Sequence, residues 1–412
     1  MELLLKSAPE VLQKAWSPLK LKLNFPLKYS RGLVTDTTIP KNQIIASTED
    51  CIPGNKLLHS DELKAHFAKD VLEYAATLHP DIPNMLERLK LAFQISSILR
   101  NKGSRLNDYC ESLPTSNLPF PFYWNKPGCS FSVYMQNLLT QEITAIKDSY
   151  EKIYDLEKKA LASMSFEEFY WTYTMVLNRS LELSEGLYIV PFMDSVSHSF
   201  EPNCEIVKEK DTFVLKSTQE IPEDQELFRD YGKLDNYEFA MRYGFVPENN
   251  PYDRFYAFPE NFEEWNKCIN FAKLHQKEPI TELENPNNYS YNSLKKKLFK
   301  KWNCSDLQRA VLPKDPPASG LEVAYRIFFL QMDDLKELGK TSVDQAFEVD
   351  FTKEVAVKNE RRMKTLILKL VDFHIRCQPE EMEGESELGK KLERTERKIL
   401  FTYLEHYRKL LV

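Results

Sequence analysis

Strand-like patterns at two distant places in the chain, separated by a long helical stretch, constrain the fold more than any other feature. Short apolar runs predict strands within residues 19–48 and again within residues 187–231. The clearest runs are Leu21–Phe25, Ile44–Ile45, Leu187–Val190, Thr212–Leu215 and Glu226–Phe228. Residues from about 57 to 178 instead repeat their apolar positions at helical spacing. We therefore expect a β core that is interrupted by a helical insertion.

Beyond about residue 260 the chain has a helical pattern again. Apolar positions recur at helical spacing around Val323–Leu330, Met363–Phe373 and Ile399–Leu411. These segments predict an all-α C-terminal domain over residues 259–412, after a first domain over residues 15–258. The fold class expected from both parts is α+β.

The charge balance argues against a nucleic-acid partner. The 412 residues carry 55 basic and 62 acidic side chains, a formal net charge of −7, so the chain has no excess positive field for phosphates. A basic protein is easier to bind electrostatically. The lysine-rich run Lys295–Trp302 is interpreted as the solvated face of a helix rather than a nuclear address.

Metal, secretion and membrane signals are missing from the sequence. The seven cysteines form no C-x-x-C pair, and the histidines show no H-x-x-x-H spacing, so we expect no metal site. No basic segment precedes an apolar run at the start, and no stretch approaches the roughly 20 apolar residues that span a bilayer. We expect a monomer that binds no membrane and is cytoplasmic, nuclear or both.

Three short segments hold the candidate functional residues. The first is the turn Ser30-Arg31-Gly32, where a glycine lets a ligand approach the backbone closely. The second runs from Asp194 to His198, after a predicted strand. The third contains the pairs Tyr231-Gly232 and Tyr243-Gly244. Taken singly, these segments are explained by a hairpin turn, a hydrogen-bonded structural histidine and two aromatic turns.

Taken together, the three segments resemble the SET domain of the Rubisco large-subunit methyltransferase type. That family also has a helical insertion inside its β core and a helical substrate-binding domain at the C-terminus. The resemblance implies a β-rich SET core with a pseudoknot-like active site over residues 15–258, with its insertion at about 57–178. Residues 259–412 would be the substrate-binding domain. The implied cofactor is S-adenosyl-L-methionine, and the implied partner is a protein substrate that presents a lysine.

The resemblance also assigns roles to individual residues. The positions that match cofactor contacts of the family are Ser30, Arg31, Gly32, Arg179, Ser197, His198 and Tyr231. The first three would lie along the methionine moiety, and the Ser197–His198 pair would hold the adenine. The positions that match substrate contacts are Arg179, Asp194 and Tyr243. Tyr231 would be the catalytic residue.

These residue types suit methyl transfer to an amine. A lysine is protonated near neutral pH and must lose its proton before it can attack, and an apolar channel favours the neutral form. The Tyr231 hydroxyl would orient the lone pair of the amine, which matters because alignment supplies much of the rate. The Tyr243 ring would accommodate a methylated ammonium product through cation–π contact.

Two departures from the family pattern leave alternatives open. Ser197 stands where the family has asparagine, which removes a cofactor hydrogen bond of about 0.5–1.5 kcal/mol, so a catalytically weak or inactive SET-fold binding protein is one alternative. A relative that methylates histidine has asparagine at the position of Leu181, so lysine is preferred here and a protein-histidine methyltransferase is the other alternative. The resemblance implies a non-histone target such as a ribosomal protein or a translation factor.

Overall fold

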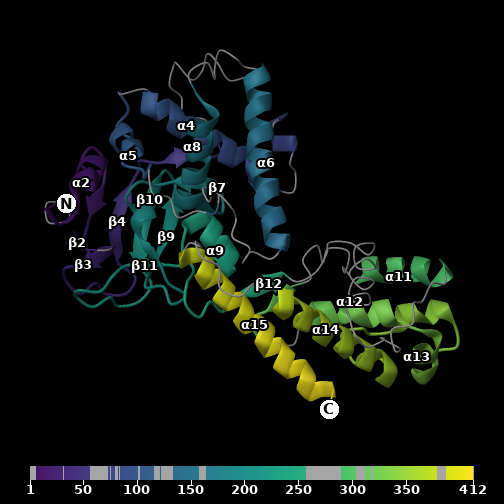
Figure 1. Ribbon diagram of the computed structural model, residues 1–412. Helices are drawn as coiled ribbons and strands as arrows, with labels where there is room; N and C mark the ends of the chain where they lie inside the picture. Colours follow the sequence, from purple (N-terminus) through teal and green to yellow (C-terminus); the bar gives the residue numbers. More distant parts are fainter. Residues whose placement is uncertain are drawn as a thin grey trace. The chain divides into compact units, whose positions relative to one another are not determined.

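The computed structural model describes residues 6–30, 32–55, 73–74, 76–78, 82, 84–100, 103–115, 121, 133–156, 164–256, 289–302, 311–316, 319–377 and 387–411. The chain divides into two compact units (Figure 1). The first consists of residues 1–123, 139–233 and 241–244, and the second of residues 124–138, 234–240 and 245–412. The expected domain limit between residues 258 and 259 stays a prediction.

A four-stranded antiparallel sheet at the centre of the first unit joins the two predicted strand regions. Its order is β1 (Lys22–Leu23), β4 (Ile44–Thr48), β10 (Thr212–Ser217) and β9 (Cys204–Glu209). Strands β4 and β10 are neighbours in the sheet although the helical segment separates them in the sequence. Ile45, Ala46 and Leu215 are fully buried, as apolar residues of a core sheet should be. The predicted interrupted β core is confirmed.

Three smaller sheets complete the strands of this unit. Strands β5 (Ile52–Pro53), β7 (Gly186–Ile189) and β6 (Leu181–Leu183) form an antiparallel sheet. Strands β2 (Leu27–Tyr29) and β3 (Leu33–Thr35) form a hairpin, and β8 (Ser197–His198) pairs in parallel with β11 (Phe228–Arg229). These last two sheets lie at the candidate site.

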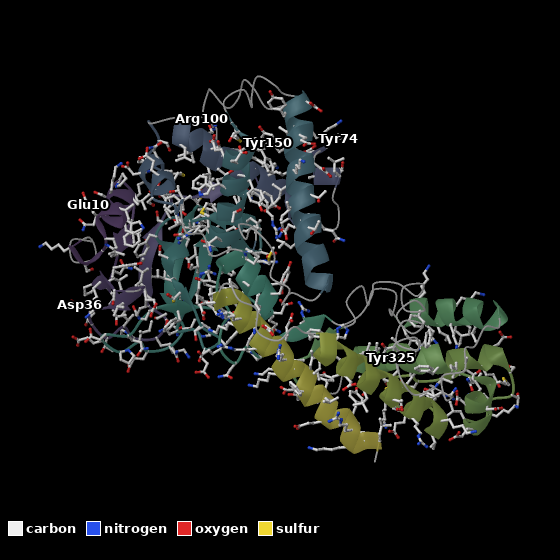
Figure 2. All side chains as sticks on the ribbon, in the orientation of Figure 1. Glu10, Asp36, Tyr74, Arg100, Tyr150 and Tyr325 are labelled. Atoms are coloured by element: carbon white, nitrogen blue, oxygen red, sulfur yellow. The ribbon has the colours of Figure 1, made fainter. Side chains whose placement is uncertain are left out.

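Helices fill the insertion between β5 and β6 where the structure describes it. They are α4 (Met85–Arg100), α5 (Asn107–Glu111), α6 (Val133–Leu156) and α8 (Phe166–Arg179); α2 (Glu10–Trp16) precedes the first strand. Ser165 begins α8 by accepting a hydrogen bond from the Glu168 amide at 3.2 Å, a common N-cap. The Phe169 ring then packs against Phe93 of α4 and Tyr150 of α6, with ring centroids 5.2 and 5.5 Å apart (Tyr150 is labelled in Figure 2).

The second unit is mainly helical, as the sequence predicts. Its helices are α11 (Tyr289–Lys301), α12 (Ser319–Phe329), α13 (Met332–Glu337), α14 (Val357–Cys377) and α15 (Glu387–Leu411), with a 3₁₀ turn η3 (Val343–Glu348). Tyr325, Ile367 and Tyr403 are fully buried in one apolar core. A short antiparallel ribbon of β12 (Arg254–Tyr256) and β13 (Val311–Pro313) is an addition that the sequence did not predict. None of the described helices has the length and apolar character to cross a membrane.

Three buried side chains complete the C-terminal end of α12. The last carbonyls of a helix have no partner within it and carry partial negative charge. Asn359 donates to the Arg326 carbonyl at 3.0 Å, Lys295 to the Phe328 carbonyl at 2.5 Å, and Arg362 to the Phe329 carbonyl at 3.3 Å. Burial lowers the pKa of Lys295 to about 8, and Arg362 acts in the same direction while Asp334 opposes it.

This depressed pKa predicts a stability that depends on pH. Between about pH 8 and pH 10.5 the unfolded chain keeps a proton on Lys295 that the folded chain has lost, so stability rises with pH across this window. Across this window, the free energy of unfolding of the native protein should rise by up to about 3 kcal/mol more than that of Lys295→Met. Urea unfolding at several pH values measures it. The exposed Lys297→Met is the control, and an equal pH dependence of the two variants would contradict the prediction.

Candidate active site

The turn between β2 and β3 contains the first predicted segment. The Ser30 amide donates to the Gly32 carbonyl at 3.0 Å, and Arg31 lies outside the described residues. A side chain at Gly32 would collide with the Glu226 carboxylate and would lie 2.9 Å from Ser197 Oγ. The absence of a side chain at Gly32 therefore lets three separate segments approach each other.

Residues 226–229 lie between the β2–β3 hairpin and strand β8. On one side the Leu227 amide donates to the Leu33 carbonyl at 2.8 Å. On the other side Phe228 is paired with Ser197, and Arg229 with His198, in parallel register. These pairings bring the first and second predicted segments together.

Tyr231 joins the third segment to the second. Its hydroxyl donates to the Val196 carbonyl at 2.8 Å, and its amide donates to His198 Nδ1 at 3.3 Å. Its ring centroid lies 4.5 Å from that of Tyr243, at the end of α9 (Asn236–Tyr243). The Asn178 side chain of α8 donates to the Arg242 carbonyl at 3.2 Å and fixes this end of α9. Burial raises the pKa of Tyr231, which keeps its hydroxyl protonated at neutral pH.

Each of the two tyrosines is followed by a glycine in a left-handed conformation. Gly232 has φ 109° and Gly244 has φ 72°, values that L-residues with side chains rarely adopt. The chain can therefore turn directly after each ring. The contact between the two rings shows that both Tyr-Gly pairs belong to one site and are not two unrelated turns.

Asp194 is buried in the turn η2 (Met193–Ser195), only 1% of its side chain being exposed. It accepts a short hydrogen bond from the Tyr109 hydroxyl, and its Oδ2 lies 3.8 Å from Arg179 Nη1. Burial raises the pKa of Asp194, while Arg179 and Tyr109 oppose this. The structure therefore places two predicted residues, Arg179 and Asp194, in direct electrostatic contact.

Comparison with known proteins agrees with this geometry. The family model for the SET domain matches residues 30–232. This chain contains a SET domain. The match begins at the β2–β3 turn and ends after Tyr231, so it includes the Gly32 turn, β8, β11 and Tyr231, whereas Tyr243 lies beyond it.

Two curated relatives are lysine methyltransferases by name. The chain is 27% identical over 225 residues to "Ribosomal lysine N-methyltransferase set10" of Schizosaccharomyces pombe, a match that covers 51% of this chain and 41% of that protein. It is 26% identical over 136 residues to "Ribosomal lysine N-methyltransferase set11" of the same organism, covering 30% of this chain and 34% of that protein. The chain thus spans less than half the length of these relatives.

Solved structures share the fold over nearly the whole chain. Rubisco LSMT bound to AdoMet superposes with a TM-score of 0.68 and 15% identity, covering 98% of this chain and 92% of the other. Rubisco LSMT bound to sinefungin and monomethyllysine gives the same values. The chain therefore has the LSMT fold, with strands in the N-terminal part and helices in the C-terminal part.

Glu226 is a residue of the SET domain that the sequence analysis did not select. It accepts a hydrogen bond from Ser197 Oγ at 2.5 Å, and its carboxylate borders Gly32. Within the part of the chain that the structure describes, no cation pairs with it. A carboxylate beside a glycine turn is a suitable acceptor for a positively charged ligand group. The sequence feature that could have pointed to Glu226 is its place shortly before the pair Tyr231-Gly232.

Arg229 is a second residue of the site that was not predicted from the sequence. The guanidinium carbon lies 4.0 Å from the centroid of the Tyr231 ring, a distance typical of a cation–π contact. Nearby, burial lowers the pKa of His198, which favours its neutral form. In the sequence Arg229 is a charged residue directly after the predicted strand run Glu226–Phe228, so its contact with Tyr231 could not be predicted.

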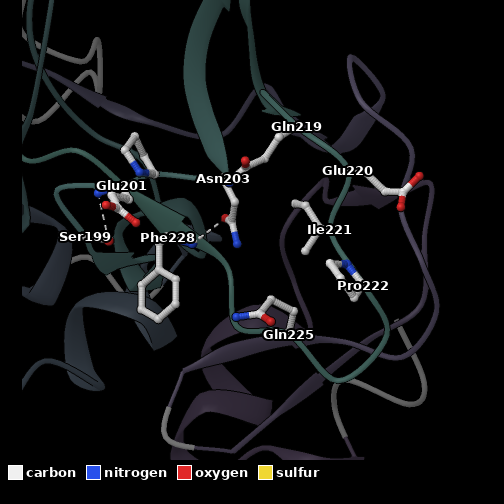
Figure 3. Close-up of a pocket in the computed structure, with 10 residues that line it drawn as sticks. Ser199, Glu201, Asn203, Gln219, Glu220, Ile221, Pro222, Gln225 and Phe228 are labelled. Carbon is white, nitrogen blue, oxygen red and sulfur yellow. Dashed lines mark hydrogen bonds between the residues drawn. The ribbon is translucent and has the colours of Figure 1, made fainter.

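A polar cavity of about 710 Å³ lies next to these segments in the SET domain (Figure 3). Its lining residues are Ser199, Glu201, Pro202, Asn203, Gln219, Glu220, Ile221, Pro222, Gln225 and Phe228. Asn203 closes one wall by accepting from the Phe228 amide at 2.8 Å. None of the predicted site residues lines this cavity, and among the described residues no cluster of His, Cys, Asp or Glu is arranged to hold a metal ion.

The hydrogen bond from Tyr109 to Asp194 leads to a stability prediction. Replacing Tyr109 by Phe removes the donor and leaves a buried carboxylate less well satisfied, which should cost about 1–3 kcal/mol of unfolding free energy. Urea unfolding measures this loss. Tyr154→Phe is the control, since Tyr154 is 41% exposed and should change stability by less than about 0.5 kcal/mol. Equal stabilities of the two variants would show that the buried hydrogen bond contributes nothing.

Proposed function

We propose that this protein is an S-adenosyl-L-methionine-dependent protein-lysine N-methyltransferase. The observation that carries the proposal is the convergence of Gly32, Ser197–His198 and Tyr231 in one site of the SET domain. The relatives set10 and set11, both named ribosomal lysine N-methyltransferases, support lysine as the acceptor. The structures of Rubisco LSMT bound to AdoMet, and to sinefungin and monomethyllysine, support the same cofactor and acceptor.

The residues at the Gly32 turn fit the amino-acid end of the proposed cofactor. The Glu226 carboxylate has a negative charge without a partner cation among the described residues, and it would accept hydrogen bonds from the α-ammonium group. Ser197 holds this carboxylate in place through its hydroxyl. The main chain of Ser197 and His198 would hold the adenine. When bound, the cofactor supplies a methyl group on a sulfonium and leaves as S-adenosylhomocysteine.

Tyr231 and Tyr243 would position the acceptor. The Tyr231 hydroxyl donates its hydrogen to Val196, so an oxygen lone pair remains to accept a hydrogen bond from the neutral amine. The lone pair of the neutral amine held there would be free to bond to the methyl carbon that the cofactor would supply, with the electrons of the broken carbon–sulfur bond staying on sulfur. The proton that the ammonium lost beforehand goes to water. The ring of Tyr243, 4.5 Å from Tyr231, would stabilise the methylated cation.

The target is proposed to be a ribosomal protein, with a translation factor as the other member of the expected class. Ribosomal proteins that bind RNA are basic, and the chain carries a net charge of −7, which favours such a partner. The helical second unit is proposed to bind this substrate. Monomeric state and location in the cytoplasm or nucleus remain predictions.

A binding protein without catalysis is the second candidate function. It is favoured by Ser197, whose hydroxyl is occupied by Glu226 where the resemblance expects an asparagine that contacts the cofactor. Such a protein would keep the fold and bind the cofactor weakly or not at all. Calorimetric titration with S-adenosylhomocysteine separates the two candidates, because only the enzyme requires binding.

Glu226→Gln should weaken cofactor binding. Removing the charge that faces the α-ammonium should raise the Kd for S-adenosylhomocysteine about 10-fold, since a charge-assisted hydrogen bond contributes about 1.5–3 kcal/mol. Isothermal titration calorimetry gives this value without an activity assay. Glu223→Gln, an exposed change nearby, is the matched control. Equal affinities of the two variants would remove Glu226 from the cofactor site.

Tyr231→Phe should abolish most of the methyl transfer. Loss of the hydroxyl that orients the amine should lower the rate about 100-fold or more while binding of S-adenosylhomocysteine is retained. Incubation with methyl-labelled cofactor and extracted ribosomal proteins measures the rate, and Tyr154→Phe is the control. No labelled band with the wild-type protein, or an undiminished band with Tyr231→Phe, would falsify the proposed mechanism.

A further inference from the structure

Arg229 places a fixed positive charge beside the proposed catalytic tyrosine. It is the second residue of β11 and is paired in register with His198 of β8. Its guanidinium lies over the Tyr231 ring at 4.0 Å, and its charge opposes the rise in the Tyr243 pKa that burial causes. The cation therefore contacts one of the two tyrosines that would position the acceptor amine and acts electrostatically on the other.

The contacts of Arg229 differ from those of an arginine that only stabilises the fold. A buried structural arginine usually has its donor groups paired with carbonyls or carboxylates. The Nε of Arg229 is buried and has no hydrogen-bond partner, and its Nη1 donates only a long hydrogen bond of 3.5 Å to the Asp230 carbonyl. Among the described residues, no carboxylate forms an ion pair with it. Its positive charge is therefore balanced only in part, by Asp194 without an ion pair, and acts on whatever occupies the site.

The groups around Arg229 leave a net positive site. Several charged or titratable side chains surround Arg229 and the residues it contacts: Arg179, Arg242, Glu182, Asp194, His198, Cys204, Glu205, Asp230, Tyr231 and Tyr243. Burial disfavours ionisation of His198, Cys204 and both tyrosines. Glu182, Glu205 and Asp230 are exposed and screened by water. The guanidinium groups of Arg179, Arg229 and Arg242 therefore stand against one buried carboxylate, Asp194.

A net positive site distinguishes between the two forms of an acceptor lysine. The ammonium form is repelled, whereas the neutral amine is not, so the proton is released more easily. Only the neutral amine has the lone pair that attacks the methyl carbon. A cation held beside Tyr231 would therefore increase the fraction of acceptor that can react at a given pH.

We propose that Arg229 is an electrostatic positioning residue that favours the neutral form of the acceptor lysine at Tyr231. This proposal rests on the proposed function, because it concerns the amine that the site would methylate. It adds a group outside the residues assigned by the family resemblance. The ammonium releases its proton to water before transfer, and Arg229 neither gains nor loses a proton.

The dependence of the rate on pH tests this role. Methyl transfer to extracted ribosomal proteins is measured from pH 6 to pH 10 at saturating S-adenosyl-L-methionine, for the wild-type protein, Arg229→Met and Arg229→Lys. In Arg229→Met the acidic limb of the profile should move to higher pH by about one unit. Arg229→Lys keeps the charge and should keep the wild-type limb, even if its maximal rate falls because lysine stacks less well than arginine.

The possible results separate a charge effect from a structural effect. Identical limbs for Arg229→Met and the wild type would overturn the proposal, and so would equal displacement in Arg229→Met and Arg229→Lys. An Arg229→Met protein that binds S-adenosylhomocysteine with wild-type affinity yet stays inactive up to pH 10 would also overturn it, because high pH supplies the neutral amine. Inactivity of the wild-type protein at every pH counts against the proposed function itself, and calorimetry with S-adenosylhomocysteine identifies that case.

Discussion

The side chain of Asn203 is hydrogen-bonded to the backbone on both sides of Leu227, and the geometry of the site depends on these two hydrogen bonds. Its side-chain carbonyl accepts from the Phe228 amide at 2.8 Å, and its side-chain amide donates to the Glu226 carbonyl at 2.8 Å. An asparagine that is only 6% exposed needs such partners, because unpaired buried polar groups are costly. The pair of bonds fixes the register of β11 beside β8. That register decides which side chains reach the Gly32 turn and which reach Tyr231.

Glu226 and Arg229 belong to one short segment, yet their side chains lie at opposite ends of the site. Glu226 is directed to Ser197 and Gly32, whereas Arg229 lies on the Tyr231 ring. A negative charge thus stands where a cationic amino-acid group would bind, and a positive charge stands where an amine must lose its proton. The opposite charges are kept apart by backbone pairing rather than by the side chains themselves. A shift of one residue in β11 would exchange these environments.

The sequence predicted the larger features because they repeat over many residues. The apolar spacing in Leu86–Arg100 and the compact run Thr212–Leu215 correspond to α4 and β10, and the Tyr-Gly pairs marked the third segment. The β12–β13 ribbon was missed because three-residue strands show no reliable periodicity. Glu226 and Arg229 were missed for a related reason, since their importance comes from contacts with residues far away in the sequence. The roles taken from the family resemblance also gave no information about Glu226 and Arg229.

The pairing of β4 with β10 has a consequence for how the protein is made. During synthesis β1 and β4 leave the ribosome early, while β10 and β9 follow only after the entire insertion has been translated. Until then the inner edge of β4 has no strand to pair with, and exposed strand edges promote aggregation. Contacts between such distant residues also fold slowly, because a long loop must close first. Helices of the insertion can form during this delay, so a chaperone that protects β4 would act on a nascent chain that is already partly helical.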